Sequence, residues 1–501
     1  MNKSVITTRL APSPTSTKTP ESKNQECAFV HLGNIRTLLY NYFLAKKLGG
    51  KFLVRLEDTD RDRYDGSFLP HFQETLEWLG ITPDYSYWNP DPSVGSFIQS
   101  ERDYSQKIQY LLDNDMAYYS FDTPQEGDAL REKGLKYDYT TRFSMRNSLT
   151  LSKDEVNNLL NSGNHYVIRF KTPENVDVTF TDAILGEITI NTATLDDKVL
   201  LKSNGIGSYH LCNVCDDHDM GVTHVLRGQE WINSTPMHVL LYQAFGWDIP
   251  TFAHLPLIMN PDGKGKLSKR TSAKYGIPIS AIGYKDANGN YQKGWREAGF
   301  EPQVLINALS LIGWNPGDER DILTMDELIE SFSLEHVSKS GARFDIDKAK
   351  WINSQWIQHR FSNKELFGDK FDHLSDEQKD ILFTEVKKRC HFRYDIQTEL
   401  DKIFVRGKML DISDDEIKLL CKLQNQLFIN NWSSKTELEN ILIDFMSINE
   451  LKNNFLGFLR KTILFGVQGV DVKSCIFILG KNEIVDRLSS YVISKEVFEL
   501  Q

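Results

Sequence analysis

The sequence lacks a hydrophobic run long enough to cross a membrane, and it lacks a regular cysteine pattern. No window reaches about 18 uncharged apolar residues, and the opening MNKSVITTRL has no apolar core of a signal peptide. Only six cysteines occur in 501 residues, and their scattered positions form no disulfide framework. These absences predict a cytoplasmic protein that is not attached to a membrane.

Basic residues are also fewer than acidic ones. Lysine and arginine number 58 against 69 aspartates and glutamates, which gives a net charge of −11. This balance argues against non-specific nucleic-acid binding over the whole surface, although it allows a local basic track. With 40% hydrophobic and 25% charged residues, the composition is typical of a globular protein, and the length predicts several domains.

Strand and helix patterns alternate at the start of the chain. SVITTRLA and KFLVRLED predict strands, whereas NIRTLLYNYFLAKKLGG and FLPHFQETLEWLG predict amphipathic helices. This alternation predicts a multidomain α/β protein with a Rossmann-type doubly wound parallel sheet. Ligands of such a sheet bind at the carboxyl ends of its strands.

The alternation is interrupted after about residue 100. Polar helical patterns and the strand-rich HYVIRFKTPENVDVTFTDAILGEITI predict an inserted α+β domain, and the α/β pattern returns at GVTHVLRGQEW. Helical patterns fill the end of the chain and predict an all-α region of two subdomains. We therefore predict five parts, at residues 1–99, 100–207, 208–255, 256–345 and 346–501, of which the first and third are halves of one catalytic domain.

Two short motifs contain residues suited to binding a nucleotide. HLGN, at residues 31–34, stands before a long predicted helix, where backbone N–H groups and the helix dipole favour a phosphate. PDGKGKLSKRTSA, at residues 261–273, places several cations among small residues, and such a loop can neutralise a triphosphate. Singly, each motif is explained better by a plain solvated loop.

Together, and in this order, the two motifs resemble the HIGH and KMSKS signatures of class I aminoacyl-tRNA synthetases. Further stretches are similar to the bacterial-type glutamyl-tRNA synthetases of that class: TRLAPSPT, KFLVRLEDTDRDR, SYHLCNVCDDHDMGVTHVLRGQEW, FAHLPLIMNPDGKGKLSKR, SLIGWNP and KSGARFDIDKAKWIN. The resemblance covers nearly the whole chain. It implies ATP-dependent ligation of L-glutamate to tRNA(Glu) through a glutamyl-adenylate, with release of AMP and pyrophosphate.

The resemblance also implies roles for the predicted domains. Residues 100–207 would bind the tRNA acceptor end, residues 256–345 would carry the KLSKR loop and contact the stem, and residues 346–501 would bind the anticodon. ATP would act as Mg-ATP, and the protein would be a monomer. No zinc is predicted, because Ser120 and Asp122 stand where some relatives have a zinc-binding C-x-C, and the C-x-x-C at residues 212–215 has no second ligand pair.

The resemblance implies two overlapping sets of site residues. The ATP-binding set is His31, Gly33, Asn34, Glu230, Lys266, Ser268 and Lys269, and its catalytic members are His31, Gly33, Lys266 and Lys269. The glutamate-binding set is Arg9, Ala11, Ser13, Glu57, Tyr209, Asn213 and Arg227.

The charges of these residues suit the amino acid. Glutamate carries two carboxylates and one ammonium, so Arg9 and Arg227 would face the carboxylates and Glu57 the ammonium. Arg227 is expected to set specificity, because a buried guanidinium pairs with a carboxylate and is left unpaired by the amide of glutamine. An ordinary ion pair explains any one of these residues, but several on motif positions favour a binding site.

Several alternatives remain within this interpretation. A non-discriminating enzyme would also charge tRNA(Gln), and the sequence does not separate it from a specific one. A glutaminyl enzyme is disfavoured by Arg227 and by the helical end of the chain, and that end also argues against a truncated tRNA-modifying relative. A catalytically impaired tRNA-binding paralogue is suggested by the extra residues 17–28, which interrupt the first motif.

These extra residues are polar, which favours a solvated loop. Lengthening a loop costs only about 0.6 kcal/mol for each doubling of its length. We therefore predict that Ser13 and His31 still converge beside the ATP site, with the insertion looping outward.

Deletion of residues 17–28 is expected to leave aminoacylation at least as fast as in the full chain, because a solvated loop would add nothing to the site. The measurement is the rate of glutamate transfer to tRNA. A collapse of that rate in a folded deletion variant would show that the loop belongs to the catalytic machinery.

Overall fold

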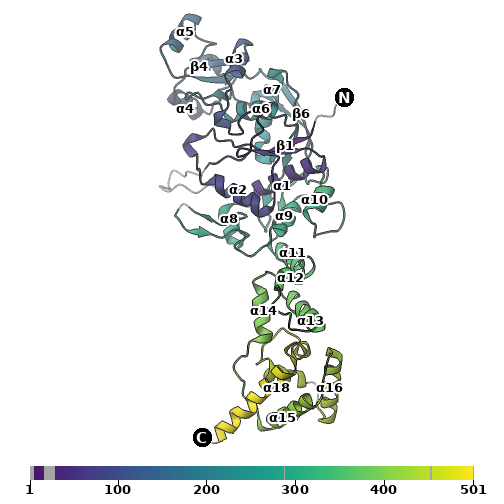
Figure 1. Cartoon of the computed structure of the whole chain (residues 1–501). Helices are drawn as coiled ribbons and strands as arrows, with labels where there is room; N and C mark the ends of the chain where they lie inside the picture. Colours follow the sequence, from purple (N-terminus) through teal and green to yellow (C-terminus); the bar gives the residue numbers. More distant parts are fainter. Residues whose placement is uncertain (1–4, 16–28, 287, 452–453, 500–501) are drawn as a thin grey trace. The chain divides into compact units, whose positions relative to one another are not determined.

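The computed structural model describes residues 5–15, 29–286, 288–451 and 454–499 (Figure 1). Contacts divide the chain into two compact units, Met1–Ile346 and Asp347–Gln501. Residues 17–28, with the predicted loop insertion, lie outside the described residues. None of the described helices combines the length and apolarity needed to span a membrane.

The first unit is built around a seven-stranded sheet with the order β3-β2-β1-β9-β10-β6-β7. Neighbouring strands are parallel, except that β6 and β7 form an antiparallel hairpin. The strands are β1 (Thr7–Leu10), β2 (Lys51–Val54), β3 (Tyr85–Ser86), β6 (Asp177–Asp182), β7 (Gly186–Asn191), β9 (His224–Gly228) and β10 (Thr251–Leu255). The predicted doubly wound parallel sheet is confirmed.

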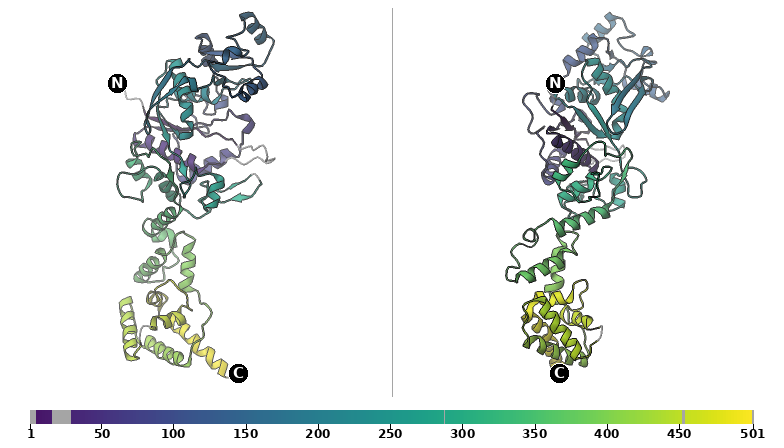
Figure 2. Two further views of the ribbon diagram at one scale, coloured as in Figure 1. Left: turned by 180° about the vertical axis from the view of Figure 1, so that it is seen from behind. Right: turned by 90° about the vertical axis from the view of Figure 1, so that its right-hand side faces the viewer.

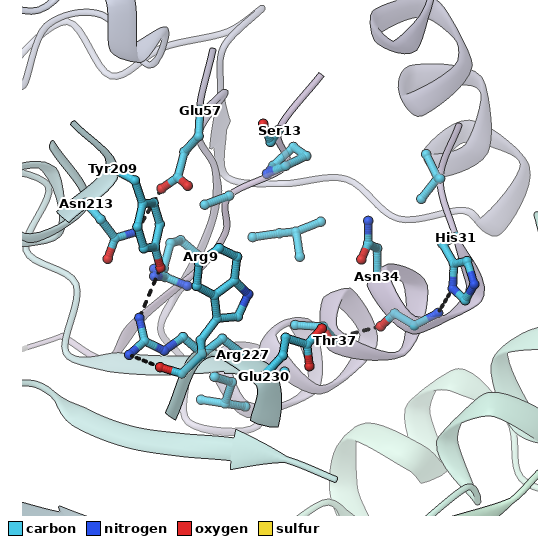
Figure 3. A pocket seen from close by; sticks show the side chains of 18 of the residues that line it. Arg9, Ser13, His31, Asn34, Thr37, Glu57, Tyr209, Asn213, Arg227 and Glu230 are labelled. Carbon is cyan, nitrogen blue, oxygen red and sulfur yellow. Dashed lines mark hydrogen bonds between the residues drawn. The ribbon is translucent and has the colours of Figure 1, made fainter. Parts of the chain in front are cut away.

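The order of the strands reverses between β1 and β9. The chain leaves β1 through α1 (Leu32–Lys47) to β2 on one side, and leaves β9 through α7 (Thr235–Phe245) to β10 on the other. Right-handed crossovers in opposite directions place the two helices on opposite faces of the sheet. A crevice forms at such a switch point, outside the carboxyl ends of the strands. Figure 3 shows the side chains that meet there.

The start of α1 is fixed by its own sequence. His31 has an extended backbone, and its side chain accepts a hydrogen bond from Gly33 N, so it caps the helix. At the other end, Gly50 lies so close to the carbonyl of Ile6 that a Cβ there would clash. This glycine lets β2 begin directly beside β1.

The predicted inserted segment, drawn in blue shades in Figure 2, contributes to two sheets. Strands β4 (Ala117–Ser120), β5 (Val167–Phe170) and β8 (Val199–Leu201) form an antiparallel sheet, while β6 joins the large sheet beside β10. The helices of the segment are α3 (Ser105–Asp113), α4 (Pro124–Glu132) and α5 (Lys153–Asn161). Its α+β character is confirmed, and its exact bounds at residues 100 and 207 stay a prediction.

The segment after β10 brings the lysine-rich loop beside α1. Leu32 N donates to the carbonyl of Ile279 at 3.0 Å, and His31 pairs with Ser280 in an isolated β-bridge. The elements of this segment are β11 (Ile258–Met259), α8 (Lys269–Lys274), β12 (Tyr284–Lys285), β13 (Tyr291–Gln292), α9 (Pro302–Ser310), α10 (Met325–Ser331) and β14 (Ala342–Arg343). Because His31 and Lys266 also line one cavity, the two predicted nucleotide motifs are neighbours in space.

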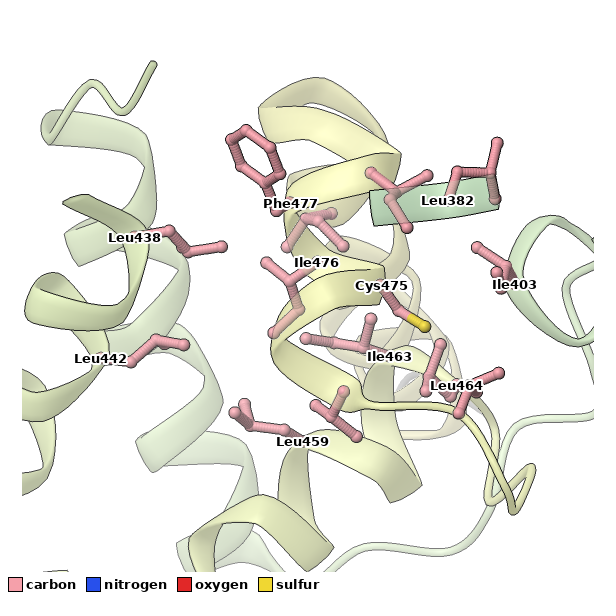
Figure 4. Packing of buried hydrophobic residues seen from close by; sticks show 14 of the residues in the cluster. Leu382, Ile403, Leu438, Leu442, Leu459, Ile463, Leu464, Cys475, Ile476 and Phe477 are labelled. Atoms are coloured by element: carbon pink, nitrogen blue, oxygen red, sulfur yellow. The ribbon is translucent and has the colours of Figure 1, made fainter. Parts of the chain in front are cut away.

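The second unit is helical in its described residues, as predicted. Its helices are α11 (Ile346–His359), which begins at the boundary, α12 (Asn363–Phe367), α13 (Asp376–Lys387), α14 (Asp395–Phe404), α15 (Asp414–Ile429), α16 (Lys435–Ile448), α17 (Phe455–Ile463) and α18 (Val472–Glu499). Leu438 and Leu442 of α16 and Ile463 of α17 belong to one buried cluster with Ile476 of α18 (Figure 4). Apolar contacts of this kind hold the unit together.

Candidate active site

A cavity of about 610 Å³ lies at the switch point of the sheet. It is lined by every predicted glutamate-binding residue and by every predicted ATP-binding residue except Ser268 and Lys269. The predicted residues in its wall are Arg9, Ala11, Ser13, His31, Gly33, Asn34, Glu57, Tyr209, Asn213, Arg227, Glu230 and Lys266. The convergence of Ser13 and His31 on one pocket is therefore observed.

Ser268 and Lys269 lie outside this lining. The Ser268 hydroxyl accepts a hydrogen bond from Thr271 N at 3.3 Å and caps α8. The Lys269 ammonium lies 5.8 Å from the ring centre of Phe29 and 5.6 Å from that of Tyr284, and these two rings stack on each other. The contacts of Lys269 thus include two cation–π contacts, and its predicted catalytic role stays a prediction.

Asp217 of α6 (Tyr209–Asp219) joins two arginines, of which Arg9 lines the cavity. Its carboxylate accepts hydrogen bonds from Arg9 Nε at 3.0 Å and Nη2 at 3.1 Å, and from Arg55 Nη1 at 2.7 Å. All three side chains are buried. Burial would raise the pKa of Asp217, but the charges of Arg9 and Arg55 outweigh it and hold the pKa below its ordinary value.

Sequence reasoning missed Asp217 and Arg55. A signal was present, because Asp217 follows Asn213 by four residues and Tyr209 by eight, so one face of α6 carries all three. For Arg55 the sequence offered only its spacing of two residues from Glu57, because its other partners, Asp216 and Asp217, lie on α6.

Glu57 presents one carboxylate oxygen to the cavity. Its Oε1 accepts hydrogen bonds from Arg55 Nη2 at 3.1 Å and from Asn213 Nδ2 at 2.8 Å. Its Oε2 accepts none from the described residues, although the residue is 8% exposed. An anion held in this way on one side is suited to a cationic group on the other, such as an ammonium.

Arg227 is surrounded by neutral acceptors. It donates to His254 Nε2 at 3.1 Å, Tyr209 Oη at 3.2 Å, His238 Nδ1 at 3.2 Å, Thr235 Oγ1 at 2.8 Å and the Trp231 carbonyl at 3.5 Å.

No carboxylate of the described chain forms an ion pair with Arg227, which is 5% exposed. Burial lowers the pKa of Arg227, yet a guanidinium stays charged in proteins. The cavity therefore contains a buried positive charge without a counter-charge, which favours a ligand with a carboxylate.

Figure 3 shows His31 at the other end of the cavity from Arg227 and Glu57, and Lys266 also lines the cavity. His31 Nδ1 accepts the Gly33 N–H at 3.0 Å, so a neutral ring carries its proton on Nε2. Burial, with the nearby charge of Lys266, lowers the pKa of His31 to about 4. Lys266 Nζ lies 3.3 Å from Glu230 Oε1, and both side chains are half exposed, so this ion pair is weak and both groups can turn to a ligand.

The described residues contain no group of three or more His, Cys, Asp or Glu side chains placed to hold a metal ion. Cys212 and Cys215 are buried within α6, and burial raises the pKa of the Cys212 thiol. Ser120 donates to Asp122 at 2.8 Å, and Tyr137 donates to the same carboxylate at 2.6 Å. These two positions therefore hold a polar hydrogen-bonded cluster.

Two family models match the chain. The model described as tRNA synthetases class I (E and Q), catalytic domain, matches residues 5–351, and the anticodon binding domain matches residues 363–492. Among similar proteins, the glutamate–tRNA ligase of Amoebophilus asiaticus is 38% identical, and the match covers 96% of this chain and 97% of that protein. That of Bacteroides thetaiotaomicron is 38% identical and covers 97% and 98%.

Solved structures agree with this match. A crystal structure of a glutamate tRNA ligase from Elizabethkingia meningosepticum, in complex with its amino acid, has a TM-score of 0.87 and 37% identity to this chain. It covers 97% of this chain and 98% of its own. The glutamate–tRNA synthetase of Elizabethkingia anophelis gives a TM-score of 0.84, also at 37% identity.

The low pKa of His31 can be measured by NMR titration of histidine-labelled protein, with a His31→Asn variant to assign its signal. We expect a midpoint of about 4. The unfolded ring takes up its proton near pH 6.5, so the stability that neutral His31 contributes above that pH is lost as the pH falls toward 4. A midpoint at or above 6.5 would contradict the buried, neutral assignment.

Proposed function

Because the chain belongs to the class I tRNA synthetases of the glutamate and glutamine type, we propose that its cavity binds L-glutamate at one end and Mg-ATP at the other. The enzyme ligates L-glutamate to tRNA(Glu) with ATP, through a glutamyl-adenylate, and releases AMP and pyrophosphate. An oxygen of the amino acid's α-carboxylate attacks the α-phosphorus and pyrophosphate leaves with the bonding electrons. The terminal ribose hydroxyl of tRNA then attacks the acyl carbon, and AMP leaves.

Recognition of the glutamate side chain is assigned to Arg227. The observation that carries this assignment is its buried charge, which has neutral partners and no carboxylate among the described residues. The carboxylate of glutamate supplies the missing counter-charge. The amide of glutamine supplies none, so the guanidinium stays uncompensated in a buried site.

The other end of the amino acid is assigned to Glu57 and Arg9. Glu57 Oε2 accepts the substrate ammonium, because Oε1 is already occupied by Arg55 and Asn213. Arg9 uses Nε and Nη2 for Asp217 and makes no bond through Nη1 within the described chain, which leaves that group for a carboxylate. In this assignment each of the three charged groups of glutamate has a partner of opposite charge in the cavity lining.

ATP binding is assigned to the start of α1 and to Lys266. The neutral His31 ring donates from Nε2, and the N-terminal N–H groups of a sixteen-residue helix favour a phosphate. Lys266 exchanges the Glu230 carboxylate for phosphate oxygens and neutralises charge as pyrophosphate departs. Hydrogen bonds and charges that are in place before the reaction lower its barrier without reorganisation.

The tRNA partner follows from the second unit, where the anticodon binding domain matches. We propose a cytoplasmic monomer that charges tRNA(Glu). A catalytically impaired paralogue is not favoured, because relatives named as ligases match the whole chain and the charged residues converge on one cavity.

Two assays test the function. Purified tRNA(Glu) and tRNA(Gln) are each incubated with glutamate and ATP, and transfer of glutamate is measured. Glutamylation of tRNA(Glu) supports the proposal, and glutamylation of both tRNAs identifies a non-discriminating enzyme. Tight tRNA binding without glutamylation, and without pyrophosphate exchange in the presence of tRNA, would overturn it.

Substitution Arg227→Gln is expected to lower kcat/KM for glutamate by about a thousandfold, since removal of one partner of a buried ion pair costs about 3 to 5 kcal/mol. The KM for ATP should change little. Arg131→Gln removes an exposed arginine of α4 and is the matched control. An Arg227→Gln enzyme that activates glutamate at the wild-type rate would contradict the assignment.

A further inference from the structure

A second layer of residues fixes the guanidinium of Arg227. His254, at the end of β10, accepts Arg227 Nε–H through its Nε2 at 3.1 Å. The other ring nitrogen, Nδ1, lies 2.7 Å from Asp182 Oδ2. Asp182 and His254 are buried, at 1% and 0% exposure, and neither lines the cavity. They therefore act on a ligand through Arg227, directly and by way of the Thr235 hydroxyl, which lies 3.1 Å from His254 Nε2 and accepts from Arg227 Nη2.

The directions of these hydrogen bonds follow from the donors. Arg227 can only donate, so His254 Nε2 must accept and the ring proton must lie on Nδ1, where it points at Asp182. Burial lowers the pKa of His254. Burial would raise the pKa of Asp182, but hydrogen bonds from His254 and two backbone N–H groups lower it below its ordinary value. The pair is a carboxylate and a neutral imidazole.

Asp182 is held without freedom to turn. Its Oδ1 accepts from Ile184 N and Leu185 N, both at 2.9 Å, and its Oδ2 also accepts His254 N at 3.0 Å. It stands at the end of β6, where that strand is registered with Phe252 of β10. Asp182, which sets the His254 tautomer, therefore comes from the hairpin β6–β7, whose strands do not line the cavity.

Loss of the Asp182 charge would disturb the contacts of Arg227. An amide at this position can present an N–H to His254 Nδ1, which favours the tautomer with its proton on Nε2. Two N–H donors, from His254 and Arg227, would then face each other. An Nε2–H of His254 would donate instead to Thr235 Oγ1, 3.1 Å away, and would compete with Arg227 Nη2 for that hydroxyl, while Arg227 Nε would lose its acceptor.

We propose that Asp182 and His254 are positioning residues that aim Arg227 at the side-chain carboxylate of glutamate, and so contribute to the choice of glutamate over glutamine. The inference rests on the proposed function, in which Arg227 binds that carboxylate. It adds a contribution of the hairpin β6–β7 to amino-acid recognition. Asp182 and His254 make no described hydrogen bond to the residues assigned to ATP.

The first test is Asp182→Asn. A misaimed guanidinium loses charge-assisted hydrogen bonds to the substrate, so the KM for glutamate should rise about 10- to 100-fold. We expect kcat to stay within about threefold and the KM for ATP to stay unchanged. The preference for glutamate over glutamine, measured by pyrophosphate exchange with tRNA present, should fall. Asp177→Asn, an exposed carboxylate on the same strand, is the matched control.

A double-mutant cycle separates positioning from a merely structural role. His254→Gln keeps an acceptor for Arg227 Nε–H that needs no tautomer, whereas His254→Leu removes it. We expect His254→Leu to raise the KM for glutamate as much as Asp182→Asn does. In His254→Gln the KM for glutamate should stay close to the wild-type value. In the His254→Gln background, Asp182→Asn should add less than about a twofold change, because the two residues act in one chain.

Nitrogen NMR of histidine-labelled enzyme supplies a readout independent of activity. His254 should show its proton on Nδ1 in the wild type and on Nε2 in Asp182→Asn. Should that variant fail to fold, the His254→Gln and His254→Leu pair decides the question by itself.

The inference is overturned by an unchanged KM for glutamate in Asp182→Asn, or by an equal loss of kcat with all substrates. It is also overturned if His254→Gln and His254→Leu behave alike. These outcomes leave the proposed function standing, provided that the wild type glutamylates tRNA and that Arg227→Gln lowers kcat/KM for glutamate as expected. Failure of the wild type itself would overturn the proposed function instead.

Discussion

The carboxylate of Asp217, buried between Arg9 and Arg55, is the interaction on which the pocket depends. It joins the end of β1, the segment after β2 and the helix α6. A buried charge is costly unless it is paired and hydrogen-bonded, and here both arginines meet the same carboxylate at hydrogen-bond distance. Arg55 extends the network to Glu57. The position of Glu57, the proposed ammonium site, therefore depends on Arg55 and Asp217, which do not line the cavity.

Arg227 represents the opposite use of a buried charge. Arg9 and Arg55 are paired with the carboxylate of Asp217. Arg227 donates only to neutral acceptors among the described residues. Such a site sacrifices some stability of the free enzyme for selective binding, because the ligand itself supplies the compensating charge. The imidazole of His254 separates Asp182 from Arg227, so the carboxylate orients the guanidinium without neutralising its charge.

Much of the fold was accessible from local patterns. The strand β1, the capped helix α1 and the helical second unit follow from periodicity and end signals that lie within each segment. The predicted lining of the cavity came from motif positions. The location of Lys269 against Phe29 and Tyr284 did not, since a cation–π contact depends on which rings the fold brings near. The joining of β6 to the large sheet was equally invisible in its alternating pattern.

The sequence by itself determined the elements, the motif residues and the family, because helix caps, strand alternation and motif spacing are properties of neighbouring residues. Only the tertiary structure decided which charges are paired. Arg9 meets a carboxylate 208 residues away, while Arg227 meets none among the described residues and is aimed by a histidine 27 residues away. Charge pairing depends on distance in space and on exclusion of water, and both arise only when distant segments pack together.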